Sequence, residues 1–514
     1  MVKFITREEA AALVKDNDIV LTEGFLRAAF PEQLSKALGD RFEKTGSPKN
    51  LTLIYSAGQG FGKGTGVDHF GKKGLLKRVI AGHYNLAPSI QQLVYSNDIE
   101  AYNFPQGTIS QLYRDSAGGR VGTLTHVGLK TFVDPRQDGG KLNSATTENL
   151  IELMNISGTE LLLYKALRGD ICFLRGSYAD EKGNISVELE GVTLNTTSIA
   201  QLVKRSGGKV VVQVSNVVQA GTLNAQFVRL PHIYVDYVVV VPIEEQTADY
   251  DPNMIPVFAG SKKIPTGSIP PLPMDERKII GRRGAMFLEP GKVVNLGIGM
   301  PETISIVANE EGIGDHMTLT VEAGPVGGVP QGGALFGVSI NPDCIIDQAY
   351  QFDFYDGGGL DLAYLGLAEC DEAGNINVSK MSGRLPGTGG FVNITQNAKK
   401  VFFCGTFTAK GLTIKSGDGK LTIVQEGSVK KFLKKVNHIT FSGEYAKQVG
   451  QPVFYLTERA VFELKADGMH LTEVAPGIDI EKDILAHMEF TPIIKDTPKI
   501  MDARIFTDAI MGME

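Results

Sequence analysis

Short apolar runs rich in β-branched residues alternate along the chain with stretches of helical periodicity. Val210–Val212 and Val238–Val241 are such apolar runs, and Glu8–Lys15 and Glu148–Met154 are such helical stretches. The apolar runs fall far short of the ~20 residues that a membrane helix needs. Their length fits buried strands, and strands that alternate with helices indicate α/β units around mainly parallel sheets.

A segment of the first half of the chain recurs in the second half. Asp170–Val187 reads DICFLRGSYADEKGNISV, and Asp361–Val378, 191 positions later, reads DLAYLGLAECDEAGNINV. The same spacing carries Lys209–Val210 onto Lys400–Val401, each at the start of an apolar run. The shared DE-x-GN-I is a turn signal between extended segments. The repeat therefore predicts two duplicated half-domains.

The beginnings of the two halves also follow one plan. Asp18–Pro31 reads DIVLTEGFLRAAFP, and Lys292–Glu302 reads KVVNLGIGMPE. Each predicts a strand, a glycine turn and a helix that Pro-Glu opens. The first half is longer between this turn and the repeat, which predicts an insertion within residues 58–140. Its glycine-rich piece, Gly58–Gly66, suits a mobile flap.

Prolines interrupt the chain between the two halves. Pro242–Pro273 has little periodicity and contains Pro252, Pro256, Pro265, Pro270 and Pro271. Such composition is typical of a linker. We predict an N-terminal domain over residues 1–244, a proline-rich linker over 245–274 and a C-terminal domain over 275–514. The expected fold class is α/β, with two similar open α/β domains and mainly parallel sheets.

Two further elements are predicted in the second half. A helix is expected to begin near Met274–Glu276 and to run toward Leu288. Val453–Glu473 alternates like a β-hairpin that turns at Asp467–Gly468, so each domain is expected to be mixed.

Composition narrows the class of protein. The net charge is -7 and no basic run stands out, which argues against a nucleic-acid surface. The four cysteines are far apart in the sequence, which argues against a disulfide framework and a zinc site. The N-terminal segment is charged throughout and lacks an apolar signal core. These features predict a soluble cytoplasmic protein of bacterial type with reduced thiols.

The most informative stretch is Thr318–Gly333, which reads TLTVEAGPVGGVPQGG. It places one carboxylate, Glu322, among glycines, so a large substrate can approach and backbone N–H groups can face it. Local sequence alone leaves a solvated or helix-capping glutamate equally open. The apolar strand Met317–Val321 leads straight into Glu322, however, and the carboxyl ends of parallel strands are where α/β sheets bind ligands.

Three other segments are candidates for the same site. Gly297-Ile298-Gly299-Met300-Pro301 lacks the third glycine of a dinucleotide fingerprint because residue 302 is glutamate. Its strand–turn–helix context fits a phosphate or pantetheine contact at a helix N-terminus, or an ordinary βα turn. Gly387–Phe391, GTGGF, is either a simple glycine loop or a loop whose amides face a carbonyl oxygen. Asn103–Thr108 contains Gln106, which taken alone is more typical of an ordinary loop glutamine.

Several other chemistries lack their motifs. Gly62-Lys63 is not part of a Walker A loop, since Ala57 and Gly64 stand at the positions that this loop needs. No H-E-x-x-H metal motif and no G-x-S-x-G nucleophile elbow occurs. Asp353, Asp356 and Asp361 are more simply explained as turn carboxylates and helix caps than as a cation site.

Taken together, these motifs resemble those of the family I CoA-transferases. TVEAGPVGG resembles the family's E-x-G-x-x-G active-site motif, and GTGGF resembles its G-x-G-G-F signature. The likeness spans nearly the whole chain and is similar to the single-chain branch of propionate and acetate CoA-transferases. Further segments carry it: Val133–Asn143, Ile280–Ala285, Gln351–Glu369, Val424–Gly427 and Val474–Leu485.

The resemblance implies a mechanism. Such an enzyme transfers CoA between a short-chain acyl-CoA and a free carboxylic acid by a ping-pong mechanism, in a catalytic cleft between its two domains. Glu322 is then the nucleophile that carries CoA as a glutamyl thioester. The N–H of Gly389, with Gly390 as the alternative, is expected to stabilise the oxyanion together with Gln106.

The resemblance also implies the ligands and the state of the enzyme. CoA contacts are expected from Gly297, Ile298, Gly299, Met300, Pro301, Gly387 and Gly390. CoA and acyl-CoA are substrates, and no metal and no tightly bound cofactor is expected. A homo-oligomer, dimer or tetramer, is expected, without a nucleic-acid or membrane partner. The alternatives are an acyl-CoA hydrolase, a ligand-sensing module on the same fold and, least favoured, a nicotinamide dehydrogenase.

Overall fold

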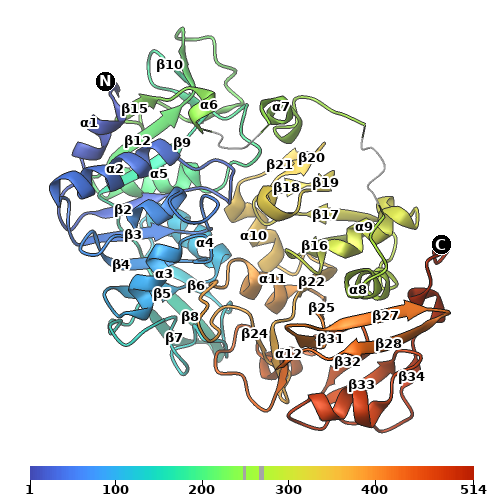
Figure 1. The fold of residues 1–514 in the computed structure, drawn as a ribbon. Helices are drawn as coiled ribbons and strands as arrows, with labels where there is room; N and C mark the ends of the chain where they lie inside the picture. Colours follow the sequence, from blue (N-terminus) through green and yellow to red (C-terminus); the bar gives the residue numbers. More distant parts are fainter. Residues whose placement is uncertain (247–250, 266–270, 514) are drawn as a thin grey trace. The chain divides into compact units, whose positions relative to one another are not determined.

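The computed structural model describes residues 1–246, 251–265 and 271–513, which form two compact units (Figure 1). The first unit contains Met1–Ile264, Val321–Asp353 and Gly383–Asn393. The second contains Pro265–Thr320, Phe354–Ser382 and Ile394–Glu514. Two parts of the expected linker, residues 247–250 and 266–270, lie outside the described residues. The domain boundaries at 244 and 275 stay a prediction.

The first unit is built on an eight-stranded sheet in which every pair of neighbours is parallel. In sheet order its strands are β1 (Lys3–Phe4), β15 (Tyr237–Val240), β12 (Lys209–Val214), β9 (Ile171–Arg175), β2 (Ile19–Thr22), β3 (Leu51–Tyr55), β4 (Leu76–Ala81) and β5 (Glu100–Asn103). Strands β3 and β9 are buried along their whole length, as expected for strands covered on both faces.

Helices pack on the faces of this sheet. Apolar side chains of α1 (Arg7–Ala12), α2 (Glu32–Thr45) and α3 (Pro88–Tyr95) share one buried core with strands β2, β3 and β4. Helices α4 (Gln106–Ala117) and α5 (Thr196–Arg205) pack on each other, and α5 packs on β9 and β12. The helix predicted at Glu8–Lys15 is thus confirmed as α1.

The second unit repeats this plan. Its sheet contains, in order, β17 (Met317–Thr320), β16 (Lys292–Leu296), β22 (Leu362–Gly366), β25 (Lys400–Cys404) and β31 (Val453–Leu456), all parallel. The sheet continues with β32 (Ala460–Lys465), which is antiparallel to β31, and β33 (Gly468–Val474), which is antiparallel to β32. It ends at β34 (Lys499–Ile500), which is parallel to β33. Helices α8 (Glu276–Ala285) and α9 (Glu302–Glu310) pack on each other beside it.

The internal repeat predicted from the sequence is confirmed. Strands β9 and β12 begin 191 positions before β22 and β25, and the order β15-β12-β9-β2-β3 matches β31-β25-β22-β16-β17. The DE-x-GN turns match in detail as well. Asp180 accepts hydrogen bonds from Asn184 N and Nδ2, and Asp371 accepts the same pair from Asn375. Each aspartate therefore closes its turn by the same bonds.

The beginnings of the halves also agree with the prediction. Helix α2 follows Pro31 and helix α9 follows Pro301, each after a parallel strand and a turn. The extra length of the first half within residues 58–140 adds β4 and β5 to the edge of the sheet. Whether Gly58–Gly66 moves as a flap stays a prediction.

One predicted helix is wrong. Residues of Glu148–Met154 belong largely to strand β7 (Ile151–Ile156), which pairs antiparallel with β8 (Thr159–Lys165) and through it with β6 (Gly122–Thr125). A two-residue turn, Ser157-Gly158, joins β7 to β8, and Gly158 has a φ of +87°. Pairing with a neighbouring strand has overridden local helix propensity here.

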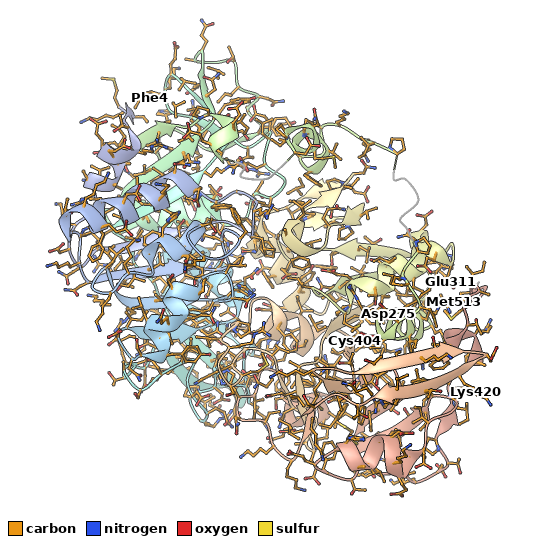
Figure 2. All side chains as sticks on the ribbon, viewed as in Figure 1. Phe4, Asp275, Glu311, Cys404, Lys420 and Met513 are labelled. Carbon is orange, nitrogen blue, oxygen red and sulfur yellow. The ribbon has the colours of Figure 1, made fainter. Side chains whose placement is uncertain are left out.

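The two predictions for the second half are confirmed. Helix α8 begins at Glu276, and Asp275 caps it by accepting hydrogen bonds from the N–H groups of Arg277 and Lys278 (Figure 2). Strands β32 and β33 form the expected hairpin, with Lys465 opposite Gly468. The end of the described chain is tied down, because the Glu311 carboxylate accepts from the N–H groups of residues 511–513 (Figure 2).

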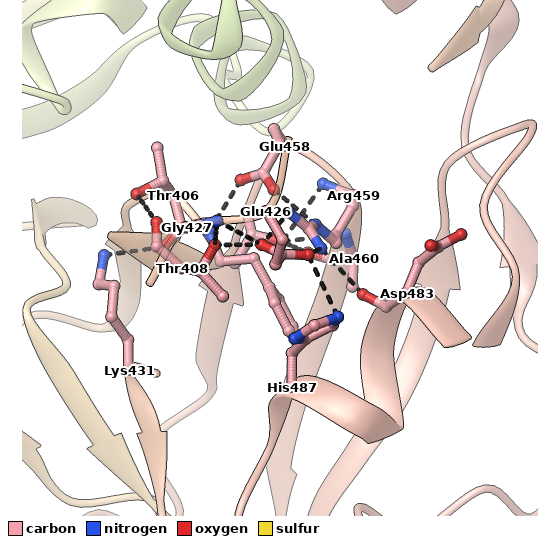
Figure 3. A network of polar contacts seen from close by, with 12 residues as sticks. Thr406, Thr408, Glu426, Gly427, Lys431, Glu458, Arg459, Ala460, Asp483 and His487 are labelled. Atoms are coloured by element: carbon pink, nitrogen blue, oxygen red, sulfur yellow. Dashed lines mark hydrogen bonds and ion pairs between the residues drawn. The ribbon is translucent and has the colours of Figure 1, made fainter. Parts of the chain in front are cut away.

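A buried ionic network stabilises the second unit (Figure 3). The Arg459 guanidinium is fully buried and pairs with Glu458 at 2.7 Å and with Glu426 at 2.6 Å. It also donates to the carbonyl oxygen of Asp483. Glu458 accepts the N–H of Phe407, so the carboxylates and the guanidinium satisfy one another and the backbone. Such a network is costly to break because it leaves buried charge unpaired.

Replacing Arg459 by methionine is therefore expected to lower the free energy of unfolding by about 3–5 kcal/mol. Thermal unfolding followed by circular dichroism measures the change. Lys495→Met is the control, since this exposed lysine pairs with the exposed Asp467 and such surface pairs are worth about 0–1 kcal/mol. Equal midpoints for the two variants would contradict a stabilising role of the network.

Candidate active site

The carboxyl edge of the first unit's parallel sheet carries a row of polar residues. Glu23 follows β2, Ser56 follows β3, His83 lies two residues beyond β4 and Gln106 three residues beyond β5. All four side chains lie at this edge, and Glu23, Ser56 and Gln106 are buried. Open α/β sheets bind ligands at this edge, so these residues define the candidate site of the unit.

The Glu322 segment belongs to the same unit. Glu322 is 9% exposed and lies in a turn in which Gly324 N–H donates to Val321 O and Val321 N–H donates to Pro325 O. Its neighbours Val321 and Ala323 are buried in one apolar cluster with Ala57, the residue after Ser56. The turn and this cluster fix the backbone of Glu322 on both sides.

The glycines after Glu322 are required by close backbone approaches. Gly324 has a φ of +124°, and a Cβ there would lie 2.1 Å from the carbonyl oxygen of Ile346. A Cβ on Gly328, with a φ of +67°, would lie 2.3 Å from the carbonyl oxygen of Ile340. These positions admit only glycine. The motif thus builds the support of Glu322 as well as leaving space around it.

The glycine loop that was predicted to face the substrate is attached to the ends of β4 and β5. Thr388 N–H donates to Asn103 Oδ1 at 2.9 Å, and Asn103 Nδ2 donates to the carbonyl of Gly82 at 2.8 Å. Gly387 has a φ of +77°, and a Cβ there would lie 2.9 Å from Gly82 O. Gly390 is buried and directly precedes helix α11 (Phe391–Asn397).

Gln106 and Gly389 are in direct contact. Gln106 N–H donates to the Gly389 carbonyl at 2.9 Å, and Gln106 Oε1 lies 3.7 Å from where a Cβ of Gly389 would be. Gly389 N–H donates to the carbonyl of Gly82 at 2.7 Å. Gln106 is 2% exposed, and its Nε2 has no hydrogen-bond partner among the described residues. The Gln106 Nε2 is therefore an unused amide donor next to the glycine loop.

His83 lies beside the same loop. Its Cδ2 is 4.0 Å from the Cβ position of Gly389, and its buried Nδ1 has no partner among the described residues. Burial lowers the pKa of His83 to about 4, so the ring is neutral at neutral pH.

A cluster of buried amides and hydroxyls lies behind Gln106. Gln348 Oε1 accepts hydrogen bonds from Asn195 Nδ2 at 2.7 Å and from Ser110 Oγ at 3.0 Å. Ser56 Oγ is 3.2 Å from the same oxygen and 3.1 Å from Glu23 Oε1. The cluster joins the ends of β2 and β3 to α4, α5 and the start of α10 (Gln348–Asp356).

The glycine turn Gly297–Pro301 lies in the second unit. Gly297 N–H donates to the Tyr364 carbonyl at 2.8 Å, and Gly299 has a φ of +87° with open space where its Cβ would be. Ile298 is half exposed. Helix α9 begins after Pro301 without a side-chain cap. Within its first turn, the N–H groups of Thr303 and Ile304 donate to the carbonyls of Met300 and Pro301.

The structure thus brings Gln106, Gly387 and Gly389 together in the first unit, which also contains Glu322 and Gly390, and places Gly297–Pro301 in the second. Sequence reasoning missed Glu23, Ser56, His83, Asn195 and Gln348. A second internal match could have indicated Ser56. Leu51–Gly58, LTLIYSAG, aligns with Met317–Gly324, MTLTVEAG. In this alignment Ser56 occupies the position equivalent to Glu322.

The described residues also bear on the other candidate features of the sequence. No helix there is both long and apolar enough to cross a membrane. No group of three or more His, Cys, Asp or Glu is arranged to hold a metal ion. Asp353 forms an ion pair with Arg114 at 2.6 Å, and Asp361 accepts the N–H of Val293. The four cysteines are free, and three of them are buried.

Comparison with known proteins gives close matches. Residues 4–241 match the family described as Coenzyme A transferase. The acetate CoA-transferase YdiF of Escherichia coli K12 is 45% identical over 480 residues, which are 93% of this chain and 90% of YdiF. The caffeate CoA-transferase of Acetobacterium woodii is 44% identical over 522 residues, which are 100% of this chain and 99% of that protein.

The solved structures agree. The YdiF apoenzyme from E. coli O157:H7 matches with a TM-score of 0.94 and 42% identity, over 100% of this chain and 98% of that one. Its thioester complex with CoA matches with a TM-score of 0.93 and 41% identity, over the same shares.

The duplicated parallel sheets and the polar carboxyl edge define a ligand-binding α/β protein. The chain belongs to the coenzyme A transferase family, in its single-chain family I branch. It is an enzyme that transfers CoA between acyl-CoA and carboxylic acids.

Proposed function

We propose that the enzyme exchanges CoA between short-chain acyl-CoA and acids of the acetate and propionate type, by a ping-pong mechanism through a thioester on Glu322. The observation that carries this proposal is the support of Glu322. Its carboxylate stands in a rigid turn of the unit that also holds Gln106 and the glycine loop. Two relatives of similar identity are named for different acids, acetate and caffeate, so experiment decides which carboxylic acid this enzyme prefers.

The chemistry proceeds by exchange of acyl and thiol partners. A carboxylate is ionised at neutral pH and needs no base to attack. Glu322 attacks the thioester carbonyl, which forms an acyl-glutamyl anhydride and releases CoA thiolate. The thiolate then attacks the glutamyl carbonyl, which gives glutamyl-CoA and frees the first carboxylate. A second carboxylate reverses these steps, so no atom is lost and no oxidant is needed.

Each step passes through a tetrahedral oxyanion that needs a hydrogen-bond donor. The unused, buried Nε2 of Gln106 supports this residue as that donor. The Gly389 N–H, predicted for the same role, donates to Gly82 here, so it serves the oxyanion only after that bond is released. Gly390 remains the alternative backbone donor.

CoA itself is proposed to contact both glycine segments. An anionic or amide part of CoA is proposed to contact the turn before α9, at Gly297, Ile298, Gly299, Met300 and Pro301, because no side chain caps this helix. Gly387 and Gly390 are proposed to admit the pantetheine because neither carries a side chain. CoA and acyl-CoA act as substrates, and no tightly bound cofactor is proposed.

We place the enzyme in the cytoplasm as a homo-oligomer, dimer or tetramer, with small-molecule substrates only. Neither a nucleic acid nor a membrane is a proposed partner. The net charge of -7 supports the first exclusion.

Mass spectrometry of the enzyme mixed with acetyl-CoA tests the covalent step. We expect the peptide that contains Glu322 to gain the mass of CoA, and borohydride to reduce that thioester to an alcohol. Addition of propionate is expected to discharge the enzyme as propionyl-CoA. Discharge to free CoA and acid in plain buffer would instead favour an acyl-CoA hydrolase, and a tag on another residue would overturn the assignment.

A further inference from the structure

Two buried polar networks among the described residues differ in one respect. In the second unit, the network around Arg459 leaves no buried side-chain nitrogen or oxygen of its members without a hydrogen-bond partner (Figure 3). In the first unit, the network around Gln348 leaves several such atoms unpaired among the described residues: Glu23 Oε2, Asn195 Oδ1, Gln348 Nε2 and Gln106 Nε2. Unsatisfied buried groups are costly and mark functional sites more often than stabilising ones.

Glu23 is the one carboxyl group of this cluster. It is 1% exposed, and its Oε1 faces Ser56 Oγ at 3.1 Å and the Gly24 N–H at 3.4 Å. No Lys, Arg or His side chain of the described residues pairs with it. An ionised carboxylate in such a place would be buried without a counter-charge, so geometry alone favours the neutral acid. Burial also raises the pKa of Glu23 to about 8.

The charge of Glu23 decides where one proton of Ser56 goes. The Ser56 hydroxyl has a single proton and two acceptors, Glu23 Oε1 and Gln348 Oε1, at 3.1 and 3.2 Å. Beside a neutral acid, Ser56 can donate to Gln348. Beside a carboxylate, it donates to Glu23, because hydrogen bonds to charged groups are about twice as strong as those between neutral groups. Gln348 then loses a donor.

Gln348 passes this change on to Gln106. The Ser110 hydroxyl can donate its proton to two acceptors, Gln348 Oε1 and the carbonyl oxygen of Gln106, each at 3.0 Å. A Gln348 oxygen that has lost Ser56 competes more strongly for the Ser110 proton. The first turn of α4, which carries Gln106, is thereby loosened.

We propose that Glu23 is a positioning residue of the transfer reaction, which as a neutral acid holds Gln106 in place through Ser56, Gln348 and Ser110. This inference rests on the role proposed above for Gln106. Loss of the Glu23 proton slows acylation of Glu322 without weakening the binding of acyl-CoA.

Tyr113, Tyr55 and His83 do not change charge in the range where Glu23 titrates. From α4, Tyr113 feels the charge of Glu23, and burial holds its pKa well above 10. From β3, burial likewise raises the pKa of Tyr55. His83 is already neutral above its pKa of about 4. From the segment before α10, Asp347 accepts the Thr193 hydroxyl at 2.7 Å.

The test is the single-turnover rate of Glu322 labelling by acetyl-CoA between pH 6 and pH 9.5. For the wild type we expect a plateau and then a fall of about tenfold for each pH unit above about 8, because only the neutral form of Glu23 is competent. Glu23→Gln, which is neutral at every pH, is expected to label within about threefold of the wild type at pH 7 and to lose the alkaline fall. Glu23→Leu is expected to label about 10–100-fold more slowly at all pH values, with the same acetyl-CoA concentration at half-maximal labelling rate.

Tyr113→Phe is the matched control and is expected to keep the alkaline fall, and thermal unfolding shows whether each variant is folded. A wild-type fall that persists in Glu23→Gln would overturn this inference alone. Absence of any label on Glu322 in the wild type at pH 7 would overturn the proposed function and this inference together.

Discussion

Replacing Glu322 by glutamine is expected to lower CoA transfer by about 10³-fold or more, because an amide cannot form the acyl-enzyme that starts each half-reaction. The change conserves the size of the side chain, and backbone bonds of Val321 with Gly324 and Pro325 close the turn at Val321–Pro325. Binding of acyl-CoA should therefore remain. Steady-state transfer from acetyl-CoA to propionate gives kcat, and isothermal titration with CoA gives the affinity.

Glu372→Gln is the control for this experiment. Glu372 is half exposed, pairs with the exposed Lys434 and lies in the second unit, so wild-type transfer is expected. A Glu322→Gln enzyme that retains more than a few per cent of kcat would refute the role of this residue. Slow deamidation to glutamate gives a rate that grows during storage, and fresh protein excludes it.

The fold could be predicted largely from periodicity and from the internal repeat. Both signals are local in the sequence or compare the chain with itself. The turn aspartates Asp180 and Asp371 illustrate this, because the asparagine that closes each turn lies four positions after its aspartate. The error at Glu148–Met154 has the opposite cause. That segment pairs with β8 and through it with β6, and strand pairing is decided by neighbours rather than by propensity.

The candidate site likewise contains residues that the sequence could predict and residues that it could not. Glu322 and the glycine loop carry motifs, so sequence could indicate them. The cluster behind Gln106 has no motif, because its hydrogen bonds join residues 33 to 292 positions apart: Glu23, Ser56, Ser110, Asn195 and Gln348. Single polar residues after apolar strands, such as Glu23 in LTEG, are a weak signal by themselves. Only the parallel order of β2 and β3 makes neighbours of Glu23 and Ser56.

Replacing Gln106 by leucine is expected to lower kcat by about 10²–10³-fold, with a small effect on KM for acyl-CoA. The Nε2 of Gln106 is buried and unused in the described structure, so its removal breaks no bond of the resting enzyme. The backbone bonds of Gln106 to Gly389 and Ser110 are independent of the side chain and should keep the helix in place. The loss should therefore appear in the transition state alone.

Gln111→Leu separates this effect from general damage to α4. Gln111 lies on the same helix, is nearly as buried and donates to Asp353. We expect Gln111→Leu to lower the thermal midpoint by a few degrees, since one intramolecular hydrogen bond contributes about 1 kcal/mol to stability. We expect its kcat to stay within about threefold of the wild type. If both variants lose kcat equally, Gln106 acts through the integrity of the helix, and a backbone N–H of Gly389 or Gly390 must stabilise the oxyanion instead.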